Sequence, residues 1–237
     1  MTVRRPVRPW AARLAVTALV ACAPGSARAQ SAPALRPWRP VLEVAAGWNG
    51  ASDLGGVDAA TRGPSVGAAT APAFRLFSTA STLDAAPAAL VAVVLPVSGQ
   101  WAVAVRGATG RPTLTTRIAN DAETAAPVDA SETLADYTVD LSVLYHLRRL
   151  GSQRVRSYLV AGGGYLRQLH EDNALVDTGR TWHGGAGVRW WVRGGDRATR
   201  PAGLTGELRW VWRSGGIAFA DGARAMPAAT LGLFVGF

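Results

Sequence analysis

The chain has 237 residues and a formal net charge of +9, but residues 1 to 29 hold five Arg and no acid, which leaves 20 basic against 16 acidic residues in the remainder. Every basic residue is Arg, and no basic helix, glycine-rich phosphate loop or zinc-ligand spacing accompanies the charge, which excludes the common nucleic-acid-binding classes. Cys22 is the only cysteine, so disulfides and Cys-ligated metals are not expected.

The first 29 residues have the pattern of a secretory signal peptide. A cationic start with four Arg precedes an apolar run of about ten residues, and Ala27-Arg28-Ala29 forms an A-x-A cleavage site. We expect cleavage after Ala29. The apolar run is too short for a membrane-spanning helix, which needs roughly 20 residues. An alternative is that the segment ending at Cys22 is a lipobox, which would make the product a lipidated periplasmic protein.

Residues 30 to 40 contain three prolines and are interpreted as a short periplasmic lead-in, and residues 41 to 237 as one domain. Segments of about ten residues with alternating polarity run through this domain, which is typical of β-strands that have one apolar face. The expected strands are 41–49, 86–97, 101–109, 136–148, 156–167, 181–193, 204–213 and 228–237. The 73–77 stretch could extend the second strand or add a hairpin, so ten strands remain an alternative.

The clearest strand is 136–148, where alternate positions from Tyr137 to Leu147 are all apolar. Tyr137 and Tyr145 lie eight residues apart, which suits an apolar band with an aromatic side chain at each rim. The same template predicts outward faces in the other strands. Among the outward residues expected in these strands are Leu42, Val44, Trp48, Trp101, Val105, Tyr158, Val160, Leu166, Trp182, Val188, Trp190, Leu208, Trp210 and Trp212.

The last expected strand ends on Phe237 with Leu231, Leu233 and Val235 on the same face. This ending, with the alternation, resembles the small OmpA/OmpX-like family of bacterial outer-membrane β-barrels. The resemblance implies an all-β, eight-stranded, antiparallel up-and-down transmembrane barrel in the bacterial outer membrane. It also implies that Phe237 is a signal for the barrel-assembly machinery. The peptidoglycan-binding domain of longer OmpA proteins is not expected.

The connections between the expected strands alternate between short and long. Those near 96–100, 149–155 and 194–203 are short, whereas those near 50–85, 110–135, 168–180 and 214–227 are long. Outer-membrane barrels have short periplasmic turns and long extracellular loops, so both termini are expected in the periplasm.

The inward positions of the expected strands carry charges that must pair, because side chains fill an eight-stranded barrel. The expected interior polar network is Glu43, Arg106, Asp140, His146, Arg167, Arg189, Glu207 and Arg209. Arg189 and Glu207 flank one short turn and are expected to form a cross-strand ion pair. Such a plugged barrel would not be a general pore. A soluble lipocalin-like barrel would have the opposite pattern, with its apolar residues inside.

No catalytic, cofactor-binding or metal-binding residue is assigned. Lipid A deacylases of similar size use a lipid-facing His, whereas His146 is expected inside and His170 and His183 near the third loop. His170, Glu171 and Asp172 could form a loop-borne acid/base pair. A metal site formed by His170, Glu171, Asp172 and Asp177 is a further alternative, but no ligand spacing supports it.

We therefore expect a non-enzymatic, monomeric outer-membrane protein with a closed interior and a structural or surface-interaction role through its extracellular loops. Its expected partners are outer-membrane lipid and lipopolysaccharide. The alternatives are a lipid-modifying enzyme and a small-solute or ion channel.

Overall fold

The computed structural model describes residues 39–62, 73–121, 126–151, 154–171, 175–193, 200–217 and 223–237. The expected signal peptide, its cleavage site at Ala29, the alternative at Cys22 and most of the 30–40 lead-in lie outside these residues. Asp172, one residue of the alternative metal site, also lies outside them.

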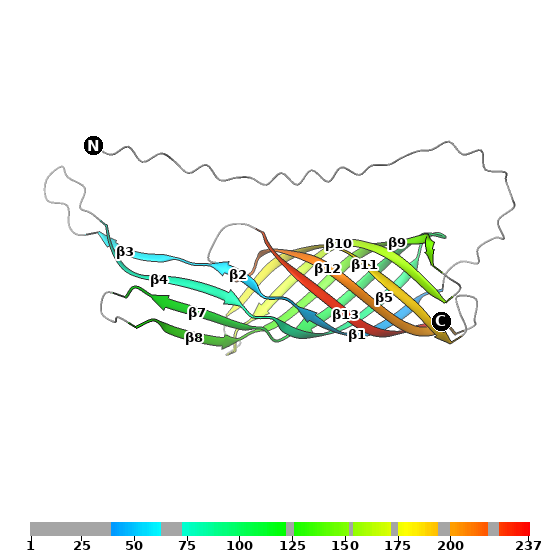
Figure 1. Ribbon diagram of the computed structural model, residues 1–237, viewed down its shortest axis with the longest axis horizontal. Coiled ribbons are helices and arrows are strands. Elements are labelled where there is room, and N and C mark those ends of the chain that lie inside the picture. Colours follow the sequence, from blue (N-terminus) through cyan, green and yellow to red (C-terminus); the bar gives the residue numbers. More distant parts are fainter. Residues whose placement is uncertain are drawn as a thin grey trace, which may run out of the picture. The chain divides into compact units, whose positions relative to one another are not determined.

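Eight antiparallel strands close into one barrel (Figure 1). They are β1 (Val41–Asn49), β5 (Ala86–Pro96), β6 (Trp101–Gly110), β9 (Ala135–Gly151), β10 (Val155–Leu169), β11 (Val176–Arg193), β12 (Ala202–Gly215) and β13 (Arg224–Gly236). Each pairs with its neighbours in chain order, and β1 pairs with both β5 and β13. All eight expected strands are present, and the barrel does not have ten.

The barrel is strongly staggered. The stagger can be followed from each residue to its cross-strand partner on the next strand. Starting at Asp136 on β9, one full circuit of the barrel returns to β9 at His146, ten residues further along. Such stagger tilts the strands against the barrel axis, and eight strands leave an interior that side chains fill. Residues that meet across the interior are therefore far apart in sequence.

A second sheet continues four of the barrel strands. It contains β2 (Ser52–Gly55), β4 (Ala73–Leu83), β7 (Thr113–Ala119) and β8 (Val128–Thr133) in the order β2-β4-β7-β8, and β3 (Asp58–Arg62) pairs with β4. This order repeats that of β1, β5, β6 and β9, to which the strands are joined by one or two residues. The first two long connections, expected as loops, are therefore largely strand. The 73–77 stretch belongs to β4, which extends the second barrel strand, β5.

The junction between the two sheets is held by backbone and apolar contacts. The Asp84 N–H donates to the Thr113 carbonyl at 2.8 Å, and the Leu134 N–H donates to the Pro112 carbonyl at 2.9 Å. A small buried cluster lies beside them and consists of Leu54, Leu83, Leu114, Leu134 and Ile217. Beyond this cluster the second sheet buries little, and β8 is exposed along almost its whole length.

The outward faces agree with the expected alternation except in β10. There the expected outward residues Tyr158, Val160 and Leu166 are buried, and Leu159 and Tyr165 are exposed instead. Arg167, expected inside, is exposed. The assignment was wrong by one residue, which exchanges the two faces of a strand. The physical reason is that Tyr158 folds against Gly187, where any side chain would overlap the tyrosine ring.

Candidate functional site in the barrel interior

The interior has an apolar layer at the end of the barrel that carries the short turns. It consists of Val41, Val94, Ala102, Ala104, Leu144, Tyr158, Val160, Trp191 and Phe234. Trp191 and Phe234 pack edge to face with ring centroids 5.6 Å apart, and the Arg156 guanidinium lies over the Trp191 ring at 5.6 Å. Bulky rings pack together at this end, where an eight-stranded barrel leaves an interior that side chains fill.

A buried ion pair lies next to this layer. Arg189 Nη2 donates to Glu43 Oε2 at 3.2 Å, and the two side chains are only 1% and 2% exposed. The Arg189 guanidinium also lies over the rings of Tyr158 and Phe234, 5.3 and 5.8 Å from their centroids. The pair joins β11 to β1 across the interior. Each charge needs the other as its partner, since a buried charge without one costs several kcal/mol.

The carboxylate of Glu207 accepts four hydrogen bonds. Arg106 donates from Nη1 and Nη2 at 3.2 and 3.4 Å, and Tyr158 donates from its hydroxyl at 2.9 Å. The fourth donor is the Nε of Arg209, two residues along the same strand. An ionised carboxylate offers about four acceptor positions, so Glu207 is fully occupied. The sequence predicted that Arg189 pairs with Glu207. In the structure, Arg189 pairs with Glu43 instead, and Glu207 binds the three donors named above.

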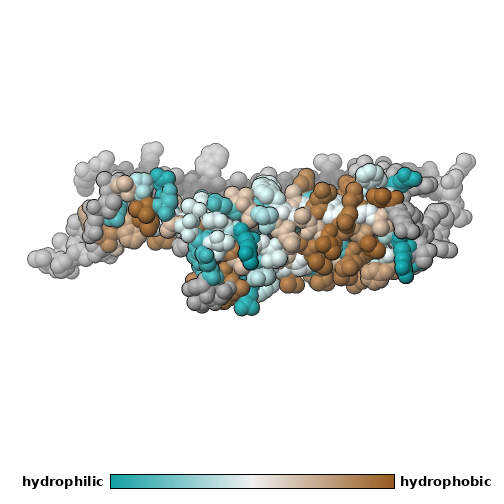
Figure 2. All heavy atoms as spheres, turned by 90° about the horizontal axis from the view of Figure 1, so that it is seen from below, coloured by the Kyte–Doolittle hydropathy of each residue, from teal (hydrophilic) through white to brown (hydrophobic). Residues whose placement is uncertain are grey.

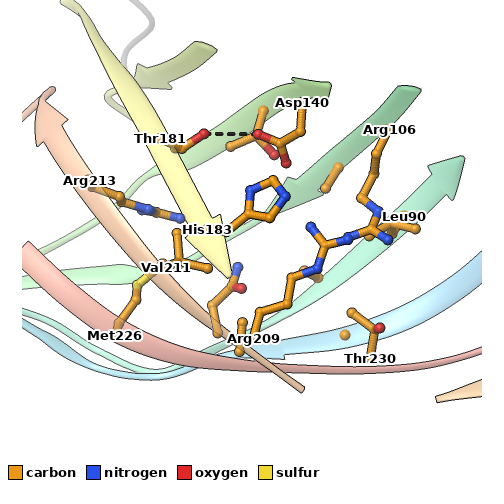
Figure 3. A pocket seen from close by; sticks show the side chains of 16 residues that line it. Leu90, Arg106, Asp140, Thr181, His183, Arg209, Val211, Arg213, Met226 and Thr230 are labelled. Carbon is orange, nitrogen blue, oxygen red and sulfur yellow. Dashed lines mark hydrogen bonds between the residues drawn. The ribbon is translucent and has the colours of Figure 1, made fainter. Parts of the chain in front are cut away.

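A cavity of about 70 Å³ lies beyond this layer, in the half of the barrel toward the long connections. Its polar lining includes Arg106, Arg209, Arg213, Asp140 and His183 (Figure 3). Small residues supply much of the remaining wall, and they are Gly47, Ala88, Ala108, Ala228 and Thr230. Their size leaves the space open, and the arginines reach into it from β6 and β12.

Further polar contacts lie at the end of the cavity that is nearer to the second sheet. Arg213 Nη1 donates to Asp136 Oδ2 at 2.8 Å, and Gln168 Nε2 donates to Asp136 Oδ1 at 2.9 Å. Gln168 Oε1 accepts from the Ile217 N–H at 3.0 Å, which ties the connection after β12 to β10. These contacts join β9, β10 and β12 near the second sheet.

A serine and a histidine are paired in the wall. Ser142 Oγ lies 2.9 Å from His183 Nε2, and the nearby Asp140 Oδ1 accepts from Thr181 Oγ1 at 2.9 Å (Figure 3). Ser142 is 1% exposed and does not line the cavity. Because a nucleophile must reach its substrate, the burial of Ser142 disfavours it as a nucleophile. His183 lies inside the barrel and not at the third loop, where it was expected.

A second polar cluster lies beyond the end of β10. His170 Nδ1 lies 2.8 Å from Glu132 Oε1 and its Nε2 lies 3.2 Å from Asp177 Oδ2. Partial burial lowers the pKa of His170, but the hydrogen bonds and charges of Glu132 and Asp177 outweigh it and raise the pKa above its usual range. The Glu171 N–H donates to Glu132. No group of His, Cys, Asp and Glu within the described residues is arranged to hold a metal ion.

The structure buries six of the eight expected interior residues: Glu43, Arg106, His146, Arg189, Glu207 and Arg209. Asp140 is partly buried and lines the cavity, and Arg167 faces outward. Sequence reasoning missed Asp136, Arg213 and Tyr158. Asp136 and Arg213 share the period-two register of Asp140 and Arg209, so that register could have identified them.

The comparison with solved structures finds a similarity, whereas the two comparisons with protein families and curated sequences do not. No protein-family model matches the chain, and no curated protein sequence matches it. Among solved structures, the outer membrane protein OprG from Pseudomonas aeruginosa is similar with a TM-score of 0.46 and 10% identity, over 85% of this chain and 97% of OprG. Within the described residues no helix is long and apolar enough to span a membrane.

Proposed function

We propose that the chain is a bacterial outer-membrane barrel with a closed interior, and that it acts through the second sheet and the long connections. The observation that carries the proposal is the outward face of the barrel, which is apolar on all sides. Residues that expose large apolar side chains there include Leu42, Val44, Val91, Val93, Val105, Val139, Leu141, Val143, Leu159, Val188, Leu208, Leu231, Leu233 and Val235. In Figure 2 hydrophobic residues gather over the barrel strands.

On two of the strands, aromatic residues border this belt at the same spacing. Tyr137 and Tyr145 on β9 are eight residues apart, and so are Trp182 and Trp190 on β11. Eight residues span about 27 Å along a strand and about 20 Å after a 40° tilt, which is close to the height of a membrane-embedded apolar band. Between these rims, no outward position of the described strands carries a charge. A water-soluble barrel has no need of such a belt.

The proposed orientation follows from the connections. Outer-membrane barrels keep their longer connections outside the cell, and the second sheet extends the first two long connections. We therefore place the second sheet at the cell surface and both termini in the periplasm. The closure of β1 on β13 leaves no open barrel edge, which favours a monomer surrounded by lipid and lipopolysaccharide.

A non-enzymatic role is supported by where the histidines lie. The chain has three: His146 and His183 are buried in the interior, and His170 lies in the cluster with Glu132 and Asp177. None faces lipid, which a lipid-modifying histidine would require. A small-solute or ion channel is disfavoured by the apolar layer around Trp191 and Phe234 and by the Glu43 to Arg189 ion pair next to it.

Two measurements test the proposal. After expression in a Gram-negative host, the protein should remain with outer membranes through a carbonate wash, and protease added to intact cells should cut within the second sheet. Release into the wash, or protection of that sheet in intact cells, would overturn the location. In planar bilayers the pure protein should give no steady conductance. A sustained current that disappears when Ala104 is enlarged to Leu would establish the channel alternative.

A further inference from the structure

The strongest unassigned feature is the cavity beyond Glu207. Arg106 and Arg209 both bind Glu207 Oε1, and Figure 3 shows their guanidinium groups side by side at the cavity. The Glu207 carboxylate already accepts its full set of hydrogen bonds. Two cations thus share one anion, and the anion has no capacity for a further donor.

Donor groups are left over at this point. Within the described residues, the Nη2 of Arg209, the Nε of Arg106 and the Nε of Arg213 are buried and meet no hydrogen-bond acceptor. Arg209 is 8% exposed and Arg106 is 4% exposed. Buried polar groups almost always have a partner, and charged donors most of all. The three arginines that carry these donors all line the same cavity.

We propose that this cavity binds one small oxyanion, a carboxylate or a phosphate, against Arg209 and Arg106. The size agrees: at roughly 10–15 Å³ for each water, about 70 Å³ holds a few waters or a ligand of about five heavy atoms. Guanidinium groups bind planar oxyanions in bidentate fashion, which adds geometric selectivity. Asp140 is itself held by Thr181 and limits the site to a single negative group near Arg209.

The ligand enters from the end with the long connections. The other end is filled by the apolar layer around Trp191 and Phe234, and the ion pair of Glu43 with Arg189 lies between that layer and the cavity. The cavity reaches as far as Asn49 and Met226 near the second sheet. It is therefore a blind site, and binding there does not imply passage through the barrel.

Arg209→Met is the sharpest variant. Glu207 keeps the two hydrogen bonds from Arg106 and the one from Tyr158 in this variant, so the barrel retains its ion pair and should fold. The second variant, Ala228→Leu, keeps every charge and fills the cavity instead, because residue 228 is the cross-strand neighbour of Arg209. Arg167→Met, on the outer surface, is the matched control.

The experiment uses the full mature protein refolded in detergent. Binding of sodium acetate and of sodium phosphate is measured by the rise in unfolding temperature, against the sodium salt of a sulfonate buffer that is too large for the cavity, at equal ionic strength. The wild type and Arg167→Met should respond to one of the two small anions. Arg209→Met and Ala228→Leu should weaken that binding about tenfold or more, as expected for loss of a charge-assisted hydrogen bond.

Three outcomes would overturn the proposal. The first is a wild type that responds equally to the small anions and the large sulfonate, which means that the cavity holds water only. The second is an equal anion response in all four proteins, which means that the anion binds elsewhere. The third is a normal response in Ala228→Leu, provided that its folded state is shown by heat-modifiable migration. None of these results depends on the location of the protein or on its role at the surface.

Discussion

The barrel and the second sheet are built from the same hairpins but are stabilised differently. Within the barrel, every strand has two neighbours and the inward side chains pack or form ion pairs, as Glu43 and Arg189 do. The second sheet is open, and its main apolar contact is the five-residue cluster at the junction. Its strands depend on the backbone hydrogen bonds of the barrel strands that they continue. The comparison indicates that the barrel folds as the stable unit and that the second sheet opens separately.

The largest expected effect concerns the buried ion pair of the barrel. Glu43→Ala leaves Arg189 in the interior without this carboxylate and should lower the free energy of unfolding by about 3–5 kcal/mol. The double variant Glu43→Leu/Arg189→Met should recover most of that loss, because both charges are removed. Urea unfolding in detergent or lipid vesicles measures both. Strictly additive effects of Glu43→Leu and Arg189→Met, measured singly and together, would show that the pair is not coupled.

Leu114→Ala tests the independence of the second sheet. It removes a buried side chain from the junction cluster, which should cost about 2–3 kcal/mol locally. We expect faster hydrogen exchange in β2, β7 and β8 and unchanged exchange in β10 to β12. Val128→Ala on the exposed β8 is the control and should change little. Equal acceleration throughout the barrel would mean that the two sheets open together.

Gly187→Ala tests how tightly the barrel interior is packed. The added methyl group overlaps the Tyr158 ring, and overpacking of this kind costs roughly 1–3 kcal/mol. Gly184→Ala on the same strand has nothing within 4 Å of the new atom and should be neutral in urea unfolding. If both variants lose the same stability, strand propensity and not packing against Tyr158 explains the effect.

The smallest expected effect is the pH dependence of the His170 cluster, which joins β8 of the second sheet to β10 and β11. The pKa of His170 is raised in the folded protein by Glu132 and Asp177. The charged bridge is therefore complete below about pH 6.5 and is lost as the pH rises through the raised pKa. Its loss should lower the stability of the second sheet by about 1 kcal/mol or less. Exchange protection of β8, corrected for intrinsic rates, should fall over that range. His170→Gln should remove the pH dependence, and an unchanged profile would exclude the bridge.

The fold was predictable wherever the outward residues are uniformly apolar. In β9 and β11 the alternation from Tyr137 to Leu147 and from Trp182 to Val192 leaves one choice of face. In β10 it does not, because Tyr158 and Tyr165 lie on opposite faces and three glycines separate them. Only the space beside Gly187 selects the inward tyrosine, and a sequence pattern does not show that space.

The partners within the interior were less predictable than its residues. Arg189 and Glu207 are near each other in adjacent strands, which favoured the expected pair, but the structure joins Arg189 to Glu43 and Glu207 to Arg106. These partners lie across the barrel and depend on its ten-residue stagger, which no local pattern encodes. The second sheet was missed because its strands bury little beyond the junction cluster and lack a continuous apolar face.

The direct continuation of β6 into β7 and of β8 into β9 has a mechanical consequence. A pull on the tip of the β7–β8 hairpin, such as one from an attached partner, draws β6 and β9 in the same direction and loads in shear the hydrogen bonds that join β6 to β5 and β9 to β10. Separating such a ladder requires many bonds to break at once, whereas a peeling force breaks them singly. The second sheet is therefore suited to carry tension into the barrel wall.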